Sequence, residues 1–289
     1  MPRPLTEDVP RSVCQEQGLY LYCLTDAEAG AYIDGLAVKG IDLENTIFSI
    51  AYRDLRAVIS KVSLDEFGEE GFAQRLKDMS WVEAKGILHV QVVKQVMSRY
   101  TVIPMRFGIV YKNEDRILAV LAENYAGFQE VLNRLRDKEE WGLKIFYDPE
   151  TLSRFIRESN KGITRLENEM ASSSTGMAYF LKKKMEKLLQ EEVERLSFTY
   201  AEECHQSLRK LAADSRLNEL MDRQLTGKDS EMILNAAYLV EKEKVKEFSR
   251  ELAHLQSEYQ PKGFEFSLSG PWPPYNFTSV KIKGEGGDV

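Results

Sequence analysis

The sequence contains few cysteines and few histidines, three of each among 289 residues. Cys14, Cys23 and Cys204 are too few and too widely spaced for a disulfide framework or a cysteine-rich zinc site. The histidines show no pair at the i, i+3 or i+4 spacing of metal ligands on a helix. We therefore expect a protein of a reducing compartment, with no metal site.

The chain also lacks a long apolar run and an excess of positive charge. Its longest strongly apolar stretches, such as Ile117–Ala122, are far shorter than the roughly 20 residues that span a bilayer. Lys and Arg number 39 against 46 Asp and Glu, a net charge of −7, which argues against a nucleic-acid partner. The N-terminus has no apolar segment typical of a secretory signal. We expect a cytoplasmic protein with no nucleic-acid and no lipid-membrane partner.

What the chain does contain predicts an α+β fold in two domains. Apolar residues make up 43% of the sequence, enough for a hydrophobic core in each half. Residues 1–17 hold three prolines without periodicity and predict a flexible N-terminus. Residues 18–148 are expected to form the first domain and residues 149–289 the second, which closes with a flexible tail.

The first domain alternates β-rich and helical patterns. Residues 26–41 predict a short crossover helix, and Arg53-Asp54 predict a tight hairpin between two strands. Helices are predicted from an N-cap at Ser80 to about residue 100 and from an N-cap at Asn113 to Leu135. Together with predicted strands at 19–25, 46–52, 55–61, 101–111 and 142–147, this order predicts a ferredoxin-like split βαβ arrangement.

The second domain begins with a predicted helical hairpin over residues 149–214, broken once at 171–176 with Thr175 as N-cap. Apolar residues from Leu181 to Leu211 recur at helical spacing, and we expect this stripe to pack inside its own domain. Lys182–Lys184 alternate with glutamates and predict an ion-paired helix face. An α/β section over residues 230–280 follows, with strands at 232–240 and 263–270 around a charged helix.

Motifs for catalysis are missing. The sequence shows no nucleophile elbow, no phosphate-binding loop and no dinucleotide fingerprint. His89 could carry a proton from a half-buried helix, but a hydrogen-bonded packing role is favoured because no partner residue accompanies it. We expect no catalytic residues and no cofactor.

Two segments stand out from this background. In the first, strand alternation would place Arg106 opposite Met105 and Phe107, where Arg106 either binds an anion or forms an internal salt bridge. In the second, prolines predict a stiff aromatic arm that leaves the sheet, either as a partner anchor or folded back over the core. The first segment consists of Pro104, Met105, Arg106, Phe107 and Gly108. The second includes Gly270, Pro271, Trp272, Pro273, Pro274, Tyr275 and Phe277.

These two segments, with the helix that carries His89 and the run Asn235–Val240, resemble the gas vesicle protein GvpF/GvpL family, from about Leu19 to Phe277. The resemblance implies an N-terminal ferredoxin-like domain and a C-terminal α+β domain with long helices. It also implies a non-enzymatic accessory or structural protein of gas vesicles, located in the cytoplasm and on the vesicle.

The resemblance further implies contact with the small hydrophobic shell subunit GvpA, and with other gas vesicle accessory proteins, during assembly or as a minor wall component. We expect the N-terminal domain to present the binding surface, because the edge strand at residues 101–111 could pair with a partner strand and lies beside Met105 and Phe107. The alternative is a ferredoxin-like module that binds a small anion or performs acid–base chemistry with Arg106 and His89.

Overall fold

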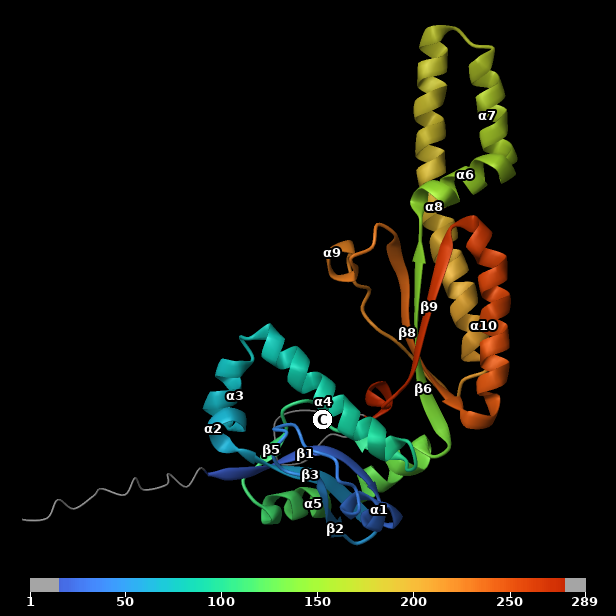
Figure 1. The fold of residues 1–289 in the computed structure, drawn as a ribbon. Coiled ribbons are helices and arrows are strands. Elements are labelled where there is room, and N and C mark those ends of the chain that lie inside the picture. Colours follow the sequence, from blue (N-terminus) through green and yellow to red (C-terminus); the bar gives the residue numbers. More distant parts are fainter. Residues whose placement is uncertain (1–15, 279–289) are drawn as a thin grey trace, which may run out of the picture. The chain divides into compact units, whose positions relative to one another are not determined.

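The computed structural model describes residues 16–278, and the chain divides into two compact units (Figure 1). The N-terminal unit comprises Met1–Arg136 with Thr278–Val289, and the C-terminal unit comprises Asp137–Phe277. Cys14 and most of both predicted flexible ends lie outside the described residues. The first strand already begins at Gln17, the last residue of the predicted flexible N-terminus.

The N-terminal unit is built on an antiparallel sheet with strand order β2-β3-β1-β4, and β5 also pairs with β1. Both β1 and β2 run antiparallel to β3, so they are parallel to each other with β3 between them, as in a split βαβ unit. The finer ferredoxin-like assignment stays a prediction. The strands are β1 (Gln17–Asp26), β2 (Phe48–Tyr52), β3 (Leu55–Ser63), β4 (Val102–Pro104) and β5 (Val110–Tyr111).

Helices pack against both faces of β1, so this strand is apolar at nearly every position. Neighbouring strand residues point to opposite faces. Tyr20 belongs to a core with Val92 and Val96 of α4, whereas Leu21 lines a small apolar gap with Leu121 of α5. The helices are α1 (Gly30–Asp34), α2 (Leu64–Phe67), α3 (Glu69–Arg75), α4 (Met79–Met97) and α5 (Glu114–Leu135), with a 3₁₀ turn η1 (Ala27–Ala29) before α1.

Polar side chains fix where the two long helices of this unit begin. Asn113 caps α5 as predicted, and its side chain accepts from the N–H of Arg116 at 3.1 Å. The predicted cap of α4 was wrong by two residues: Asp78, not Ser80, is the N-cap. Its carboxylate accepts from the N–H groups of Ser80 and Trp81. An acidic side chain there also interacts favourably with the helix dipole.

The boundary between the units differs from the predicted one at residue 148. Strand β6 (Lys138–Tyr147) was assigned to the first domain, but it pairs with β8 and β9 in the second sheet. The division therefore falls between Arg136 and Asp137, before the strand rather than after it.

The C-terminal unit has a sheet of strand order β7-β8-β6-β9. One face packs against α8 and α10 in a core that includes Leu143, Tyr238 and Phe248. The remaining strands are β7 (Asp214–Leu217), β8 (Glu231–Glu241) and β9 (Phe264–Trp272). The helices are α6 (Pro149–Ser159), α7 (Lys161–Ala171), α8 (Thr175–Arg209), α9 (Arg223–Thr226) and α10 (Val245–Tyr259), with 3₁₀ turns η2 (Lys242–Lys244), η3 (Gln260–Lys262) and η4 (Tyr275–Phe277).

The predicted helical hairpin is present, as α7 and α8 (Figure 1). The helical region has a second, unpredicted break at Asn160. Asn160 ends α6 and caps α7, and Ser174 rather than Thr175 is the N-cap of α8. The stripe on α8 packs inside its own unit as predicted, with Leu189 and Leu208 in the core. None of the helices within residues 16–278 is long and apolar enough to cross a membrane.

Candidate functional site

The segment Pro104–Gly108 lies in the N-terminal unit and connects β4 to β5. Pro104 ends β4, and Met105 is almost fully buried, with its N–H donating to the carbonyl of Tyr22 at 2.9 Å. Arg106 is exposed, and Phe107 is half-buried. The predicted alternation therefore places Arg106 correctly, but it assigned Met105 to a partner surface that this side chain cannot reach from the core.

Tyr20 and His89 hold this segment in place by a continuous chain of hydrogen bonds. The N–H of Gly108 donates to the Tyr20 hydroxyl at 2.9 Å, and that hydroxyl lies 3.0 Å from Nδ1 of His89. Nε2 of His89 lies 3.1 Å from the carbonyl oxygen of Met105. Because the carbonyl can only accept, Nε2 carries the proton and Nδ1 accepts from Tyr20. Both ends of the segment are thereby tied to α4 through one side chain.

The same geometry assigns His89 a packing role, as favoured from the sequence. His89 is 2% exposed, and burial lowers its pKa to about 4, so the ring is neutral near pH 7. Both ring nitrogens have partners within the unit. Exposed Arg106 and buried His89 therefore do not form a shared anion-binding or acid–base site in the described residues.

Gly108 is required where it stands. Its φ of +94° is a conformation that side-chain-bearing residues avoid, and an added Cβ would lie 2.3 Å from the ring of Phe72. We expect Gly108→Ala to lower the free energy of unfolding by about 2 kcal/mol.

Chemical denaturation provides the measurement, and Gly86→Ala is the matched control. A Cβ at Gly86 of α4 meets no atom within 4 Å, so that substitution should stabilise the chain by up to about 1 kcal/mol. Equal effects at the two glycines would contradict the assigned role of Gly108.

Aromatic rings surround the segment on its inner side. The ring of Phe107 lies 5.6 Å from that of Phe72, 6.1 Å from that of Trp81 and 6.1 Å from that of His89. Such edge and tilted contacts between rings add to the burial of their apolar area. Phe107 is thus part of the packing between the segment and α4, and Trp81 brings the first turn of α4 into the same cluster.

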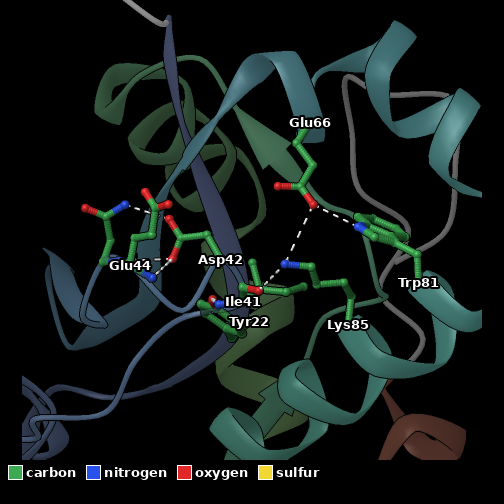
Figure 2. A network of polar contacts seen from close by, with 8 residues as sticks. Tyr22, Ile41, Asp42, Glu44, Glu66, Trp81 and Lys85 are labelled. Carbon is green, nitrogen blue, oxygen red and sulfur yellow. Dashed lines mark hydrogen bonds and ion pairs between the residues drawn. The ribbon is translucent and has the colours of Figure 1, made fainter.

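Lys85 of α4 is turned inward, toward a polar network (Figure 2). Its ammonium donates to the carbonyl oxygen of Ile41 at 2.9 Å and lies 3.7 Å from the carboxylate of Glu66. The same carboxylate accepts from Nε1 of Trp81 at 2.8 Å, and the N–H of Ile41 donates to the hydroxyl of Tyr22 at 2.7 Å. The ammonium of Lys85 therefore makes its contacts inside the unit instead of on the surface of the helix.

A polar hollow of about 280 Å³ lies beside this network, lined by acidic side chains that include Asp42, Asp65 and Glu66. Asp42 is already used within its own loop, where it accepts from the N–H groups of Glu44 and Asn45 at 3.0 Å each. In residues 16–278, no group of three or more His, Cys, Asp or Glu side chains is placed to hold a metal ion.

The outer side of α4 has the composition of a contact surface. Among its 19 residues only Glu83, Lys85 and Lys94 are charged, and the charge of Lys85 is buried in the network above. We define the α4 outer face as the adjacent residues Met79, Glu83, Gly86, Ile87 and Val90, which share one side of the helix. Met79 and Ile87 are exposed, Ile87 by 51% of its surface. Ser80, Gln91 and Gln95 are also exposed on α4, so its solvent side is uncharged apart from Glu83 but mixes polar with apolar side chains.

The segment Gly270–Phe277 does not project as an arm. Gly270, Pro271 and Trp272 still belong to β9, and the following turn η4 folds back so that Phe277 is 1% exposed. The prediction that the prolines end the strand was wrong at Pro271, because among residues 16–278 β9 pairs on one side only and a missing N–H on its other side costs no ladder bond. The folded-back alternative describes the segment correctly.

Glu140 of β6 fastens this folded-back segment. Its carboxylate accepts from the backbone N–H of Asn276 at 3.1 Å and from the side-chain amide of Asn276 at 2.7 Å. The side chain is almost fully buried, and burial raises the pKa of Glu140 to about 7. Glu140 was not predicted as a functional residue, because a single glutamate in a strand gives no signal of the residue that it will contact.

Comparison with known proteins identifies relatives along most of the chain. The family model described as "Gas vesicle synthesis protein GvpL/GvpF" matches residues 18–279. "Gas vesicle protein L" of Streptomyces sp. strain CB03234 is 24% identical over 261 residues, which are 90% of this chain and 92% of that protein. "Gas vesicle protein F" of Haloferax mediterranei is 22% identical over 249 residues, 86% of this chain and 88% of that protein.

Solved structures share the fold. The crystal structure of GvpF from Anabaena sp. PCC7120 superposes with a TM-score of 0.65 at 19% identity and covers 92% of this chain and 99% of its own. That of GvpF from Microcystis aeruginosa has a TM-score of 0.62 at 21% identity, with 91% and 99% covered. With its family model matched over nearly all of its length, the chain belongs to the gas vesicle GvpL/GvpF family.

Proposed function

We propose that this chain is a non-enzymatic accessory protein that binds the hydrophobic shell subunit GvpA and assists assembly of the gas vesicle, with a place as a minor wall component. Membership of the GvpL/GvpF family supports this proposal. Its physical basis is that an apolar shell subunit aggregates unless its exposed surface is covered before it joins the wall. Other gas vesicle accessory proteins are further partners.

The observation that carries the proposal is the α4 outer face. It exposes Met79 and Ile87 beside Gly86, where the helix backbone is open to close approach. Glu83 is the single charged residue of this face. An apolar partner that covers Met79, Gly86 and Ile87 desolvates no charge as long as the carboxylate of Glu83 stays in water at the rim of the contact. The N-terminal unit is thus the proposed binding unit, as expected from the sequence.

The strands at residues 101–111 offer a partner less binding surface than the α4 outer face does. β4 spans three buried residues and ends in Pro104, and β5 spans two, so little backbone is left to pair with a partner strand. The segment Pro104–Gly108 instead supports α4 from within, through His89 and Trp81. We therefore assign this segment the role of holding the α4 outer face in position.

Co-expression with GvpA and affinity recovery of the full chain test this proposal. A glutamate in place of Ile87 would have to be buried without a partner, so we expect Ile87→Glu to reduce recovered GvpA about tenfold or more. Leu43→Glu is the matched control, because Leu43 is similarly exposed, at 56%, in a loop of the same unit.

Unchanged recovery with Ile87→Glu would remove the α4 outer face from the proposal. Failure of the unsubstituted chain to recover GvpA, under conditions in which an established GvpA binder recovers it, would contradict GvpA binding itself.

A further inference from the structure

The outer strands of the two sheets differ in how they are protected against pairing with another chain. On β2, the N–H of Ser49 is occupied by the carboxylate of Asp34 at 2.8 Å. β4 is short, buried and contains Pro104, and β7 spans four residues. Short strands, prolines and occupied N–H groups are the usual means of blocking a sheet edge.

β9 has none of these protections along most of its length. It spans nine residues and pairs with β6 on one side, and no strand within residues 16–278 pairs with its other side. The N–H of Asp148 donates to the carbonyl of Gly263 at 2.9 Å, one step beyond the end of the β6–β9 ladder. Because ladder bonds alternate, residues 265, 267 and 269 bond to β6, and the backbone groups of Phe266 and Leu268 point outward.

The side chains of β9 also favour a partner strand. Phe266 and Leu268 pack at the margin of the core and are half-buried, so they retain apolar surface that a neighbouring strand would cover. The single charged residue of β9 is Glu265, and its carboxylate is already paired with the ammonium of Lys228. No unpaired charge on β9 therefore opposes the approach of a second strand.

We propose that β9 is an interface between two copies of this chain, paired antiparallel about a two-fold axis at Ser267. In this register Phe266 faces Leu268 of the second copy, and the outward backbone groups of both exchange hydrogen bonds. Glu265 faces Ser269 of the second copy, so no like charges are opposed. The sequence of β9 is thus complementary to itself, and the two four-stranded sheets join into one continuous sheet. This inference is independent of GvpA binding, which involves the N-terminal unit.

Disulfide trapping tests the register directly, in a full chain with Cys14→Ser. The other native cysteines, Cys23 and Cys204, are buried. Directly opposed residues of a non-hydrogen-bonded antiparallel pair lie about 4.5 Å apart between Cα atoms, within the range of a disulfide. We expect Ser267→Cys to form a covalent dimer on mild oxidation.

Ser269→Cys is the matched control, because it is an exposed serine on the same face. Its counterpart in the second copy would be displaced by four residues, roughly 13 Å, which is too far for a disulfide. Equal cross-linking of the two variants, or none with Ser267→Cys, would overturn the proposed pairing.

The mass in solution is an independent readout that needs no cysteine. Sedimentation of the unsubstituted chain should give twice the 33.2 kDa of one copy. Leu268→Lys places a charge at the unpaired edge of β9, so this variant should be monomeric. Leu217→Lys on β7 should leave the dimer intact. A folded, unsubstituted chain that sediments as one copy at micromolar concentrations would overturn the inference.

Discussion

Acidification from pH 7 to pH 4 is expected to lower the free energy of unfolding of the N-terminal unit by about 3 kcal/mol through His89 alone. Burial holds the pKa of His89 at about 4 in the folded chain, compared with an ordinary value of 6.5. Between these two values the unfolded chain binds a proton that the folded chain does not. The stability is therefore complete above pH 6.5 and is lost as the pH falls toward 4.

Chemical denaturation at several pH values measures this loss. Trp81 is in the N-terminal unit, so its fluorescence reports on that unit once Trp141 and Trp272 are replaced by phenylalanine. His89→Gln keeps a polar side chain near Tyr20 and Met105 but does not titrate, so the acid-induced loss should largely disappear in that variant. Equal acid sensitivity of the two chains would contradict the neutral, buried state of His89.

The C-terminal unit is expected to respond to pH in the opposite direction. Burial raises the pKa of Glu140 to about 7 in the folded chain, compared with an ordinary value of 4.5. Between these values the folded chain holds a proton that the unfolded chain releases. The stability from this proton is present in full below pH 4.5 and is lost as the pH rises through 7, by about 3 kcal/mol in total.

Glu140→Gln isolates this effect. The amide oxygen can still accept from the side chain of Asn276, although its NH2 cannot accept from the backbone N–H as the second carboxylate oxygen does. The uncharged side chain avoids the free-energy cost of burying a charge at high pH. We expect the variant to be more stable than the unsubstituted chain at pH 8 by up to about 3 kcal/mol and to match it near pH 4.5. Trp141 fluorescence, with the other tryptophans replaced, provides the readout. A variant less stable than the unsubstituted chain at pH 8 would contradict the raised pKa of Glu140.

Local patterns predicted those parts of the fold that local interactions determine. The Arg53-Asp54 turn joins β2 and β3 as predicted, and Asn113 caps α5. The predicted strand at 101–111 is present as two short strands, β4 and β5, with the interruption after Pro104. In each case the side chain or backbone conformation that decides the structure lies within a few residues of its effect.

Contacts between residues far apart in the sequence determine the parts of the fold that local patterns do not predict. The pattern of β6 predicts a strand but not its partners, and these are β8 and β9, far along the chain. The same holds for the candidate site. Strand alternation predicts an exposed Met105, but the backbone of this residue forms hydrogen bonds with Tyr22 and His89. The missed α2 and α3 are short helices whose caps, Ser63 and Gly68, give weak signals.

Site-specific cross-linking between this chain and GvpA tests the central claim most directly. A photoreactive amino acid at position 87, on the α4 outer face, should form a covalent adduct with GvpA in co-expressing cells. The same probe at Phe198, an exposed position on α8 of the C-terminal unit, should not. Adducts from position 198 but not from 87, or from neither position, would contradict the proposal that the N-terminal unit binds the shell subunit.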